Sequence, residues 1–412
     1  MKKTYKFRIY PSKTHEQRLN KALSQACGLY NQLLDIKQQI YLGEGESLSE
    51  YDLNNLAKDF DTLQLHSQTK QNIASRITEA YKHFFRRVKN GDEPGFPKFK
   101  SWKFYQSITF PQYRQKVKGN KLYVSKVGMV PIVLHREIEG QIKTLTIKKE
   151  NTEWYATFSC DACPVVEQAI DFVSEVEGLD VGLSKFLVSS DVRELSNPRW
   201  LRESESTLVK LQRRLSKKKR GSKNRLKAKL KVAKLHQTIT RQREDFHKKL
   251  ARKLAMQIKY IGIEDLNVQG MVKNHCLAKS ISDVGWGSFF AYLKYYKTIF
   301  DGDVIEIGRF EPTSQTCSKC GHRQDMPLKE RTFVCGNCHV RIDRDLNAAL
   351  NIKRLTISKL RESGIEFTND TVGHAEISTP EEIPPLCSHS ECESGITESG
   401  TKRVEVVVVC HQ

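Results

Sequence analysis

The chain has 412 residues and a mass of 47.4 kDa, which predicts about two to four structural units. Hydrophobic residues make up 38% of it, and no apolar run reaches the roughly 18–20 residues of a membrane helix. The 68 Lys and Arg residues outnumber the 48 Asp and Glu residues, so the net charge is +20. We therefore expect nucleic acid as the partner and no membrane, and the absence of an apolar signal segment at the start predicts a cytoplasmic location.

The first hundred residues predict one strand followed by helices. Residues 4–10 alternate in polarity as a strand does, and Thr14 and Gln17 stand at capping-box spacing for the helix that follows. Helical periodicity then runs through 15–42, 49–63 and 66–90.

The segment 81–100 mixes aromatic with basic side chains, and it sets Lys98 and Lys100 beside Phe96 and Phe99. Aromatic faces between lysines suit stacking on nucleic-acid bases. A buried loop anchored by the two phenylalanines explains the same pattern. The sequence leaves both interpretations open.

Residues 104–160 have a β-like pattern. Two alternating runs, 143–149 and 154–160, flank residues 150–152 and predict a hairpin. Cys160 and Cys163 form a CxxC pair with no second pair nearby, so we interpret this pair as incidental.

From residue 176 the pattern changes to short apolar strands with helices between and after them. We expect strands at 176–181, 185–190, 258–264 and 303–308, and helices that include 286–300 and 346–360. This alternation predicts an α/β sheet.

The most basic stretch is 207–250, which has seventeen Lys and Arg residues against two acidic ones. Its apolar residues recur at helical spacing and are interrupted at 221–222, so we expect two long helices with basic outer faces. A run this one-sided repels itself unless phosphates neutralise it, which favours nucleic-acid contact over a solvated face. The expected contacts include Lys217, Lys218, Lys219, Arg220 and Arg243.

Three carboxylates stand out by position. Asp180 and Glu264 each end an otherwise apolar strand, and Asp345 precedes a helix. A buried acid needs a cation or hydrogen-bond partners. Clustered, the three acids suit Mg²⁺, and two such ions about 3.5–4 Å apart serve phosphodiester hydrolysis. Taken singly, Asp345 also fits a helix N-cap, and the other two fit surface acids at strand ends.

Four of the eleven cysteines form two CxxC pairs separated by fourteen residues. They are Cys317, Cys320, Cys335 and Cys338. Two such knuckles with adjacent glycines can build a closed tetrahedral site, so we predict structural Zn²⁺. The odd cysteine count and this spacing fit a reducing compartment better than a disulfide framework.

The end of the chain has the opposite charge. Residues 366–412 carry nine acidic and two basic side chains and are rich in Ser, Thr, Gly and Pro. We interpret 365–412 as a disordered acidic tail, in which only 404–409 could form a short strand.

The order of these features resembles the TnpB (OrfB-type) proteins of bacterial insertion sequences, which are related to type V CRISPR effector nucleases. The resemblance covers roughly residues 1–360. It rests on the segments 81–87, 95–100, 178–182, 242–247, 263–266, 313–321 and 343–349.

The resemblance implies an α/β, RuvC-like nuclease domain of the RNase H fold at 171–311 and 341–364, interrupted by a zinc ribbon at 312–340. It also implies a small wedge-like β-barrel at 1–10 and 104–170, with a helical recognition lobe at 11–103 inserted in it.

The resemblance further implies roles for single residues. Asp180, Glu264 and Asp345 match the family's three catalytic, Mg²⁺-binding acids, and the four cysteines match its zinc ligands. Gln71 stands where the family has a glutamine implicated in reading a short motif beside the target. The family binds a guide RNA transcribed from the transposon end and cuts target DNA next to that motif, while base pairing reads the rest of the target.

Two other functions stay open. Some relatives have lost catalytic acids and act as guided DNA-binding regulators, whereas all three positions are acidic here, which favours an active nuclease. The family's older transposase label suggests strand transfer, which the same two-metal chemistry serves. The sequence does not give the oligomeric state.

Overall fold

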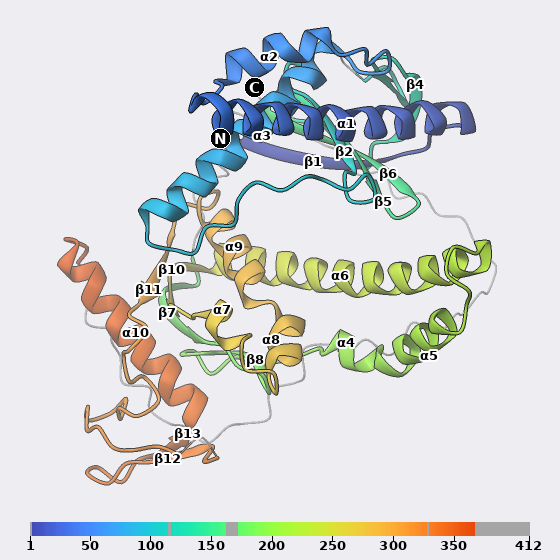
Figure 1. Cartoon of the computed structure of the whole chain (residues 1–412). Coiled ribbons are helices and arrows are strands. Elements are labelled where there is room, and N and C mark those ends of the chain that lie inside the picture. Colours follow the sequence, from blue (N-terminus) through green and yellow to red (C-terminus); the bar gives the residue numbers. More distant parts are fainter. Residues whose placement is uncertain (1, 114–116, 162–171, 328, 367–412) are drawn as a thin grey trace, which may run out of the picture. The chain divides into compact units, whose positions relative to one another are not determined.

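The computed structural model describes residues 2–113, 117–161, 172–327 and 329–366 (Figure 1). The described part is mixed α/β, as predicted, with sheets of six, five and two strands. The predicted acidic tail lies outside the described residues from position 367 onward, as does the short strand considered at 404–409. Within the described ranges, no helix has both the length and the apolar character needed to cross a membrane.

The six-stranded sheet is antiparallel throughout. Its strands are β1 (Lys2–Ile9), β2 (Ser107–Phe110), β3 (Lys121–Val124), β4 (Gly128–Val133), β5 (Gln141–Glu150) and β6 (Glu153–Asp161). They lie in the order β2-β5-β6-β1-β4-β3, so the first strand of the chain is paired between strands that come more than a hundred residues later. The predicted hairpin is confirmed, and Asn151 in its turn has a φ of 55°.

Three helices separate β1 from the rest of this sheet. They are α1 (Lys13–Glu44), α2 (Glu50–Asp59) and α3 (Ser67–Lys89), close to the predicted ranges. The predicted capping residues of α1 are wrong. Ser12 is the N-cap and accepts a hydrogen bond from the amide of His15, and the helix begins at Lys13, two residues earlier than a cap at Thr14 would allow. The helices and the sheet share one hydrophobic core, to which α1 contributes a stripe that includes Leu19, Leu23, Leu33 and Leu34.

The five-stranded sheet has the order β11-β10-β7-β8-β9. Its strands are β7 (Ser174–Asp180), β8 (Lys185–Ser189), β9 (Glu194–Ser196), β10 (Ile258–Glu264) and β11 (Asp303–Ile307). The first three form antiparallel hairpins, and β7, β10 and β11 run parallel to one another. Parallel strands need long crossover connections, and helices supply them here.

Helices cover this sheet on both faces. The helices of this region are α4 (Trp200–Glu203), α5 (Glu205–Ser216), α6 (Lys223–Gln257), α7 (Val268–Met271), α8 (Ala278–Val284), α9 (Trp286–Lys297) and α10 (Arg344–Glu362). Leu179, Ile261 and Ile263 face a core built with α6, α8 and α9, whereas Val176 packs against α10 on the opposite face. The two basic helices predicted in 207–250 are confirmed as α5 and α6, with Ser222 as the N-cap of α6.

Candidate active site and metal centre

Asp180 and Glu264 end neighbouring parallel strands. Leu179 of β7 pairs with Ile263 of β10, so the two acids that follow stand side by side at the carboxyl edge of the sheet. In sheets with parallel strands, this edge is where ligands bind. Both residues are partly exposed there.

A pair of glycines lies on the same face of the sheet as the acids and lets a helix approach it closely. Gly178 and Gly262 are paired in register, two residues before the acids, and side chains two residues apart on a strand share a face. A Cβ on Gly178 would lie 2.1 Å from the carbonyl oxygen of Ala349 and 2.4 Å from the amide nitrogen of Lys353, both in α10. A Cβ on Gly262 would lie 2.0 Å from Oγ1 of Thr356. Helix α10 therefore crosses the sheet in direct contact with its backbone, on the face of the two acids.

Asp345 lies in the first turn of α10, one turn before the residue that rests on Gly178. The interpretation of Asp345 as the N-cap is wrong, because Asp343 fills that position. Its carboxylate accepts hydrogen bonds from the amides of Asp345 (2.9 Å) and Leu346 (3.1 Å). The Asp345 side chain is left free of capping and is about one-fifth exposed.

The charges of the other two acids act on Asp180. Burial of the Asp180 carboxylate, together with the negative charges of Glu264 and Asp345, raises the pKa of Asp180 well above its usual range. The Arg344 guanidinium opposes this shift, as does the amide of Val181. Elements far apart in the sequence thus concentrate negative charge at one point, an arrangement that a divalent cation stabilises.

A polar network that the sequence analysis missed connects this edge to the segment after β11. Thr313 donates a hydrogen bond from Oγ1 to Oε1 of Glu264 at 2.5 Å. Asn351 of α10 donates from Nδ2 to the carbonyl oxygens of Thr313 (2.8 Å) and Thr316 (2.6 Å), and Asn347 donates to the latter at 2.8 Å. Both asparagines are fully buried. The two asparagines are four residues apart on the apolar side of an amphipathic helix. This spacing was the sequence signal that could have indicated a buried polar network.

The four predicted cysteines converge. Their sulfur atoms all lie within 4.8 Å of one another, and among the described residues no other set of three or more His, Cys, Asp or Glu ligand atoms is gathered this closely. The three carboxylates are therefore spaced more widely than the thiols. The Cys317–Cys338 and Cys320–Cys335 sulfur pairs are each 3.6 Å apart, near the separation of about 3.8 Å expected for a tetrahedron with Zn–S bonds of about 2.3 Å.

Two turns of similar design hold the thiols. The amide of Cys317 donates to the carbonyl of His322, and the amide of Cys335 donates to that of Val340. The residue after each second cysteine has a positive φ, 75° at Gly321 and 56° at His339. The short sheet of β12 (Thr332–Val334) and β13 (Arg341–Asp343) flanks the second turn. Amide donors, first that of His322, lower the pKa of Cys320 to about 6, as suits a thiolate ligand.

The cations expected to contact nucleic acid have different surroundings. Lys217 to Arg220 form the exposed turn between α5 and α6. Arg243, by contrast, lies 2.8 Å from the buried carboxylate of Asp283. Lys98 and Lys100 are exposed between α3 and β2, and Gln71 is exposed on α3. Their contacts with nucleic acid remain predictions.

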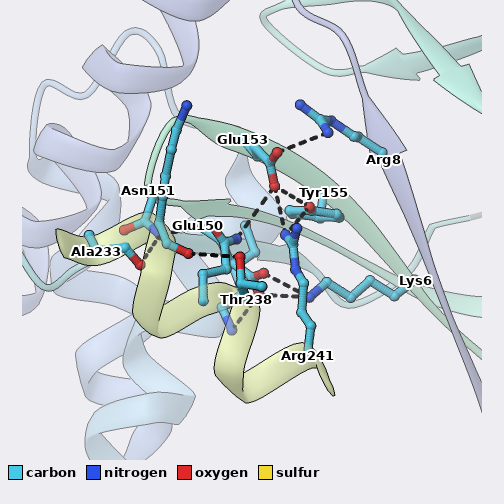
Figure 2. Close-up of polar contacts among 12 residues, drawn as sticks. Lys6, Arg8, Glu150, Asn151, Glu153, Tyr155, Ala233, Thr238 and Arg241 are labelled. Atoms are coloured by element: carbon cyan, nitrogen blue, oxygen red, sulfur yellow. Dashed lines mark hydrogen bonds and ion pairs between the residues drawn. The ribbon is translucent and has the colours of Figure 1, made fainter. Parts of the chain in front are cut away.

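One side of α6 contacts the β5–β6 hairpin (Figure 2). Nη2 of Arg241 lies 2.6 Å from Oε2 of Glu153 and donates to the Tyr155 hydroxyl, and Arg8 of β1 pairs with the other oxygen of Glu153 at 2.9 Å. The Tyr155 hydroxyl, followed by the Arg241 guanidinium, lowers the pKa of Glu153 to about 2. Nδ2 of Asn151 donates to Gln237 at 2.9 Å. The basic surface of α6 that is available to a polyanion is therefore smaller than the sequence suggests.

Three family models match the chain. One described as a probable transposase, OrfB of IS605, matches residues 173–275, which include β7 and β10. A Cas12f1-like TNB domain matches residues 286–352, which include the cysteine cluster and Asp345. A helix-turn-helix domain of OrfB matches residues 1–46, although this part of the chain is one strand followed by one long helix.

Curated relatives match over most of the chain. A Streptomyces pristinaespiralis protein provisionally named RNA-guided DNA endonuclease is 28% identical, over 85% of this chain and 89% of its own length. The similarly named InsQ of Escherichia coli K12 is 27% identical over 69% of this chain and 73% of its own length.

A solved structure shares the fold. A cryo-EM structure of a Cas12f1–sgRNA–target DNA complex superposes with a TM-score of 0.56 at 16% identity, and the match covers 86% of this chain and 98% of that one.

Proposed function

Because the chain belongs to the TnpB (OrfB-type) family, we propose that it is an RNA-guided, metal-dependent endonuclease that cuts DNA. One observation carries the proposal: three carboxylates from two adjacent strand ends and one helix start lie at one face of a sheet, close enough for Glu264 and Asp345 to raise the pKa of Asp180. The names of the relatives support the same activity. Guide RNA and target DNA are the partners that this activity requires.

Asp180, Glu264 and Asp345 would hold Mg²⁺, since carboxylate oxygens are its preferred protein ligands and their mutual repulsion is relieved by a cation. A pair of bound Mg²⁺ ions would supply the positive charge that activates a water and stabilises the leaving oxygen of a phosphodiester. Thr313 orients the Glu264 carboxylate through its hydrogen bond. Asp343 fixes the first turn of α10 and so the position of Asp345.

The remaining assignments follow from family membership and belong to the same proposal. The five-stranded sheet with its helices would be the RuvC-like nuclease domain, and the cysteine cluster a structural zinc ribbon. The six-stranded sheet would be the wedge, with α1 to α3 as its inserted recognition lobe. Gln71 would contact the short motif beside the target, and Lys217 to Arg220 the nucleic-acid backbone.

The test is to sequence the RNA that copurifies with the protein and then measure cleavage of a plasmid library with a randomised flank. Asp180→Ala should lower the cleavage rate about a hundredfold or more and leave the copurified RNA unchanged. Glu306→Gln is the matched control, because Glu306 is an exposed acid on β11 of the same sheet, paired with Lys294, and it should cleave like the wild type.

Two outcomes would contradict the proposal. Equal loss of RNA binding and cleavage in Asp180→Ala would mean that Asp180 is structural. A wild-type ribonucleoprotein that binds its target in Mg²⁺ without cutting would indicate a guided regulator, and one that joins transposon ends would indicate strand transfer.

A further inference from the structure

The chain between α3 and β2 presents large aromatic side chains to solvent. We name residues 95–105 the aromatic strap; it runs from the end of α3 toward β2 (Figure 1). Phe99 is 54% exposed, Trp102 70% and Phe104 84%. The other three tryptophans of the chain are buried or partly buried. A segment that only linked two elements would gain stability by burying these rings, so their exposure needs a reason.

The aromatic strap is held in place although its rings are exposed. At its start the ring of Phe96 packs edge-on against Tyr81 and Phe84 of α3, with centroids 5.8 and 5.0 Å apart. In its middle Asn31 of α1 bonds the backbone of Lys100 twice: Oδ1 accepts from the amide at 2.7 Å, and Nδ2 donates to the carbonyl at 2.9 Å.

The end of the strap is anchored by a buried tyrosine. Tyr105 is 8% exposed, its ring packs against Tyr30 of α1 at 6.1 Å, and its hydroxyl accepts a hydrogen bond from Arg76 of α3 at 3.1 Å. Fixed at three points, the strap presents Phe99, Trp102 and Phe104 from a defined backbone. A partner therefore meets a surface that is already ordered, which lowers the entropic cost of binding.

The charge around these rings selects the partner. Lys98, Lys100 and Lys103 alternate with the aromatic residues, and no Asp or Glu occurs between positions 94 and 136. The Lys103 ammonium lies 5.8 Å from the centroid of the Trp102 ring. An apolar protein surface would have to desolvate these ammonium groups along with the rings, which is costly. Unpaired nucleotides instead offer flat bases to the rings and phosphates to the lysines.

We propose that the aromatic strap is a stacking platform for the unpaired bases of single-stranded nucleic acid. The inference builds on the proposed function, because a guided nuclease must handle single strands of guide and displaced DNA. Phe99, Trp102 and Phe104 would stack on bases, and the three lysines would contact the intervening phosphates. Trp102, as the most exposed tryptophan, would report binding directly.

The first experiment follows the tryptophan fluorescence of the full chain, to which Trp102 is the most exposed contributor, freed of copurifying RNA, during titration with single strands of equal length. The probes are an RNA, the DNA of the same sequence, and an abasic DNA with the same phosphates. We expect the two base-bearing strands to quench the emission and the abasic strand to leave it unchanged. Whichever of the RNA and the DNA quenches the emission more strongly is the type of single strand that the strap binds. Equal quenching by the abasic strand would overturn the proposal, because the contact would then be with phosphate alone.

The second experiment compares affinities for the better strand. Trp102→Ala should weaken binding roughly 5- to 150-fold, the range for loss of one stacked base, while Trp102→Phe should retain most of the affinity. Tyr51→Ala is the matched control, since Tyr51 is 73% exposed but lies between Glu50 and Asp52, and it should bind like the wild type. Equal affinities of Trp102→Ala and the wild type would overturn the proposal.

Failure of this proposal can be told from failure of the nuclease proposal. If Trp102→Ala binds single strands normally and the wild type still cuts its guided target, only the stacking role is wrong. If base-dependent quenching occurs but the wild type does not cut, the stacking role stands and the nuclease proposal fails. A change of oligomeric state in Trp102→Ala without nucleic acid, measured by light scattering, would instead assign the strap to contact with a second copy and overturn the proposal.

Discussion

The three carboxylates and the four cysteines are both sets of side chains of the types that bind metals, and the chain brings each set together in a different way. The cysteines come from two tight turns within residues 317–340, each turn closed by its own backbone hydrogen bonds. The carboxylates come from two strands and a helix between positions 180 and 345, and their approach depends on how closely α10 packs on the sheet. The cysteines are a local set, whose geometry depends on the two turns. The carboxylates are a distributed set, whose geometry depends on how the helices pack on the sheet.

The largest effect should come from disrupting the contact between α10 and the sheet on which the distributed set depends. Gly178→Val would place side-chain atoms against the backbone of α10, which cannot move without leaving the sheet. We expect cleavage to be lost and the free energy of unfolding to fall by about 3 kcal/mol or more, measured by denaturant titration. Zinc content, measured by atomic emission, should stay at the wild-type level because the turns close locally.

Gly28→Ala is the control for this variant. Gly28 lies inside α1 with no atom within 4 Å of a built Cβ, so the substitution should stabilise the protein by about 0.5–1 kcal/mol. Full cleavage by Gly178→Val would show that the acids do not need α10 in this position.

The next largest effect should come from the local set. Cys335→Ser removes one buried thiol from the four, so we expect bound zinc to fall well below one equivalent. Stability should fall too, because Asn347 of α10 accepts a hydrogen bond from the amide of Ser318 in the first cysteine turn, and Asn351 donates to the carbonyl of Thr313 just before it. Cys276→Ser, at an exposed cysteine outside the cluster, should retain full zinc and stability. Normal zinc in Cys335→Ser would exclude the four-thiol site.

A moderate effect is expected where the two sets are joined. Thr313→Val removes the hydrogen bond to Glu264 and keeps the shape of the side chain. Loss of one such bond is worth about 1 kcal/mol, so cleavage should slow about fivefold, with a higher Mg²⁺ concentration needed for half-maximal rate. Thr240→Val, at an exposed threonine on α6, is the control. An unchanged Mg²⁺ requirement would show that Thr313 does not position Glu264.

The smallest effect should be on the melting temperature, when the negative charge of Asp180 is removed in the absence of metal. Since the pKa of Asp180 is raised in the folded chain, the folded state holds the proton more tightly than the unfolded state. Ionised Asp180 therefore lowers the free energy of unfolding as pH rises above the ordinary pKa of Asp, about 3.9. In chelator at pH 7, Asp180→Asn should melt a few degrees higher than the wild type. The difference should shrink toward pH 4 or on adding Mg²⁺. A lower melting temperature for Asp180→Asn would mean that the charge is already compensated.

Local patterns were sufficient to predict most elements and the cysteine cluster. The strands and helices of the α/β region fall within a few residues of their predicted positions, because apolar periodicity reports burial directly. The exact helix starts were harder to predict, because two neighbouring residues of each helix have side chains suited to capping. These are Ser12 and Thr14 for α1, and Asp343 and Asp345 for α10. Only the backbone geometry shows which of each pair begins the helix.

Contacts between distant positions could not be predicted in this way. Nothing local marks Gly178 and Gly262 as partners, or Arg243 as the partner of a buried Asp283. The exposure of the aromatic strap also could not be read from its sequence, because a buried loop and a binding surface require the same aromatic residues. Such features depend on which elements meet in three dimensions.

The position of α10 in the chain has a consequence for synthesis. Asp345 and the backbone that covers Gly178 leave the ribosome after β7 and β10, after the basic helices α5 and α6, and after the cysteine turns. A nascent or prematurely terminated polypeptide that stops short of this helix lacks the third carboxylate, although it already displays the cationic turn at 217–220. If Asp345 acts as proposed, such a fragment would adhere to nucleic acid without cutting it, and cleavage would begin only once the chain has been translated beyond α10.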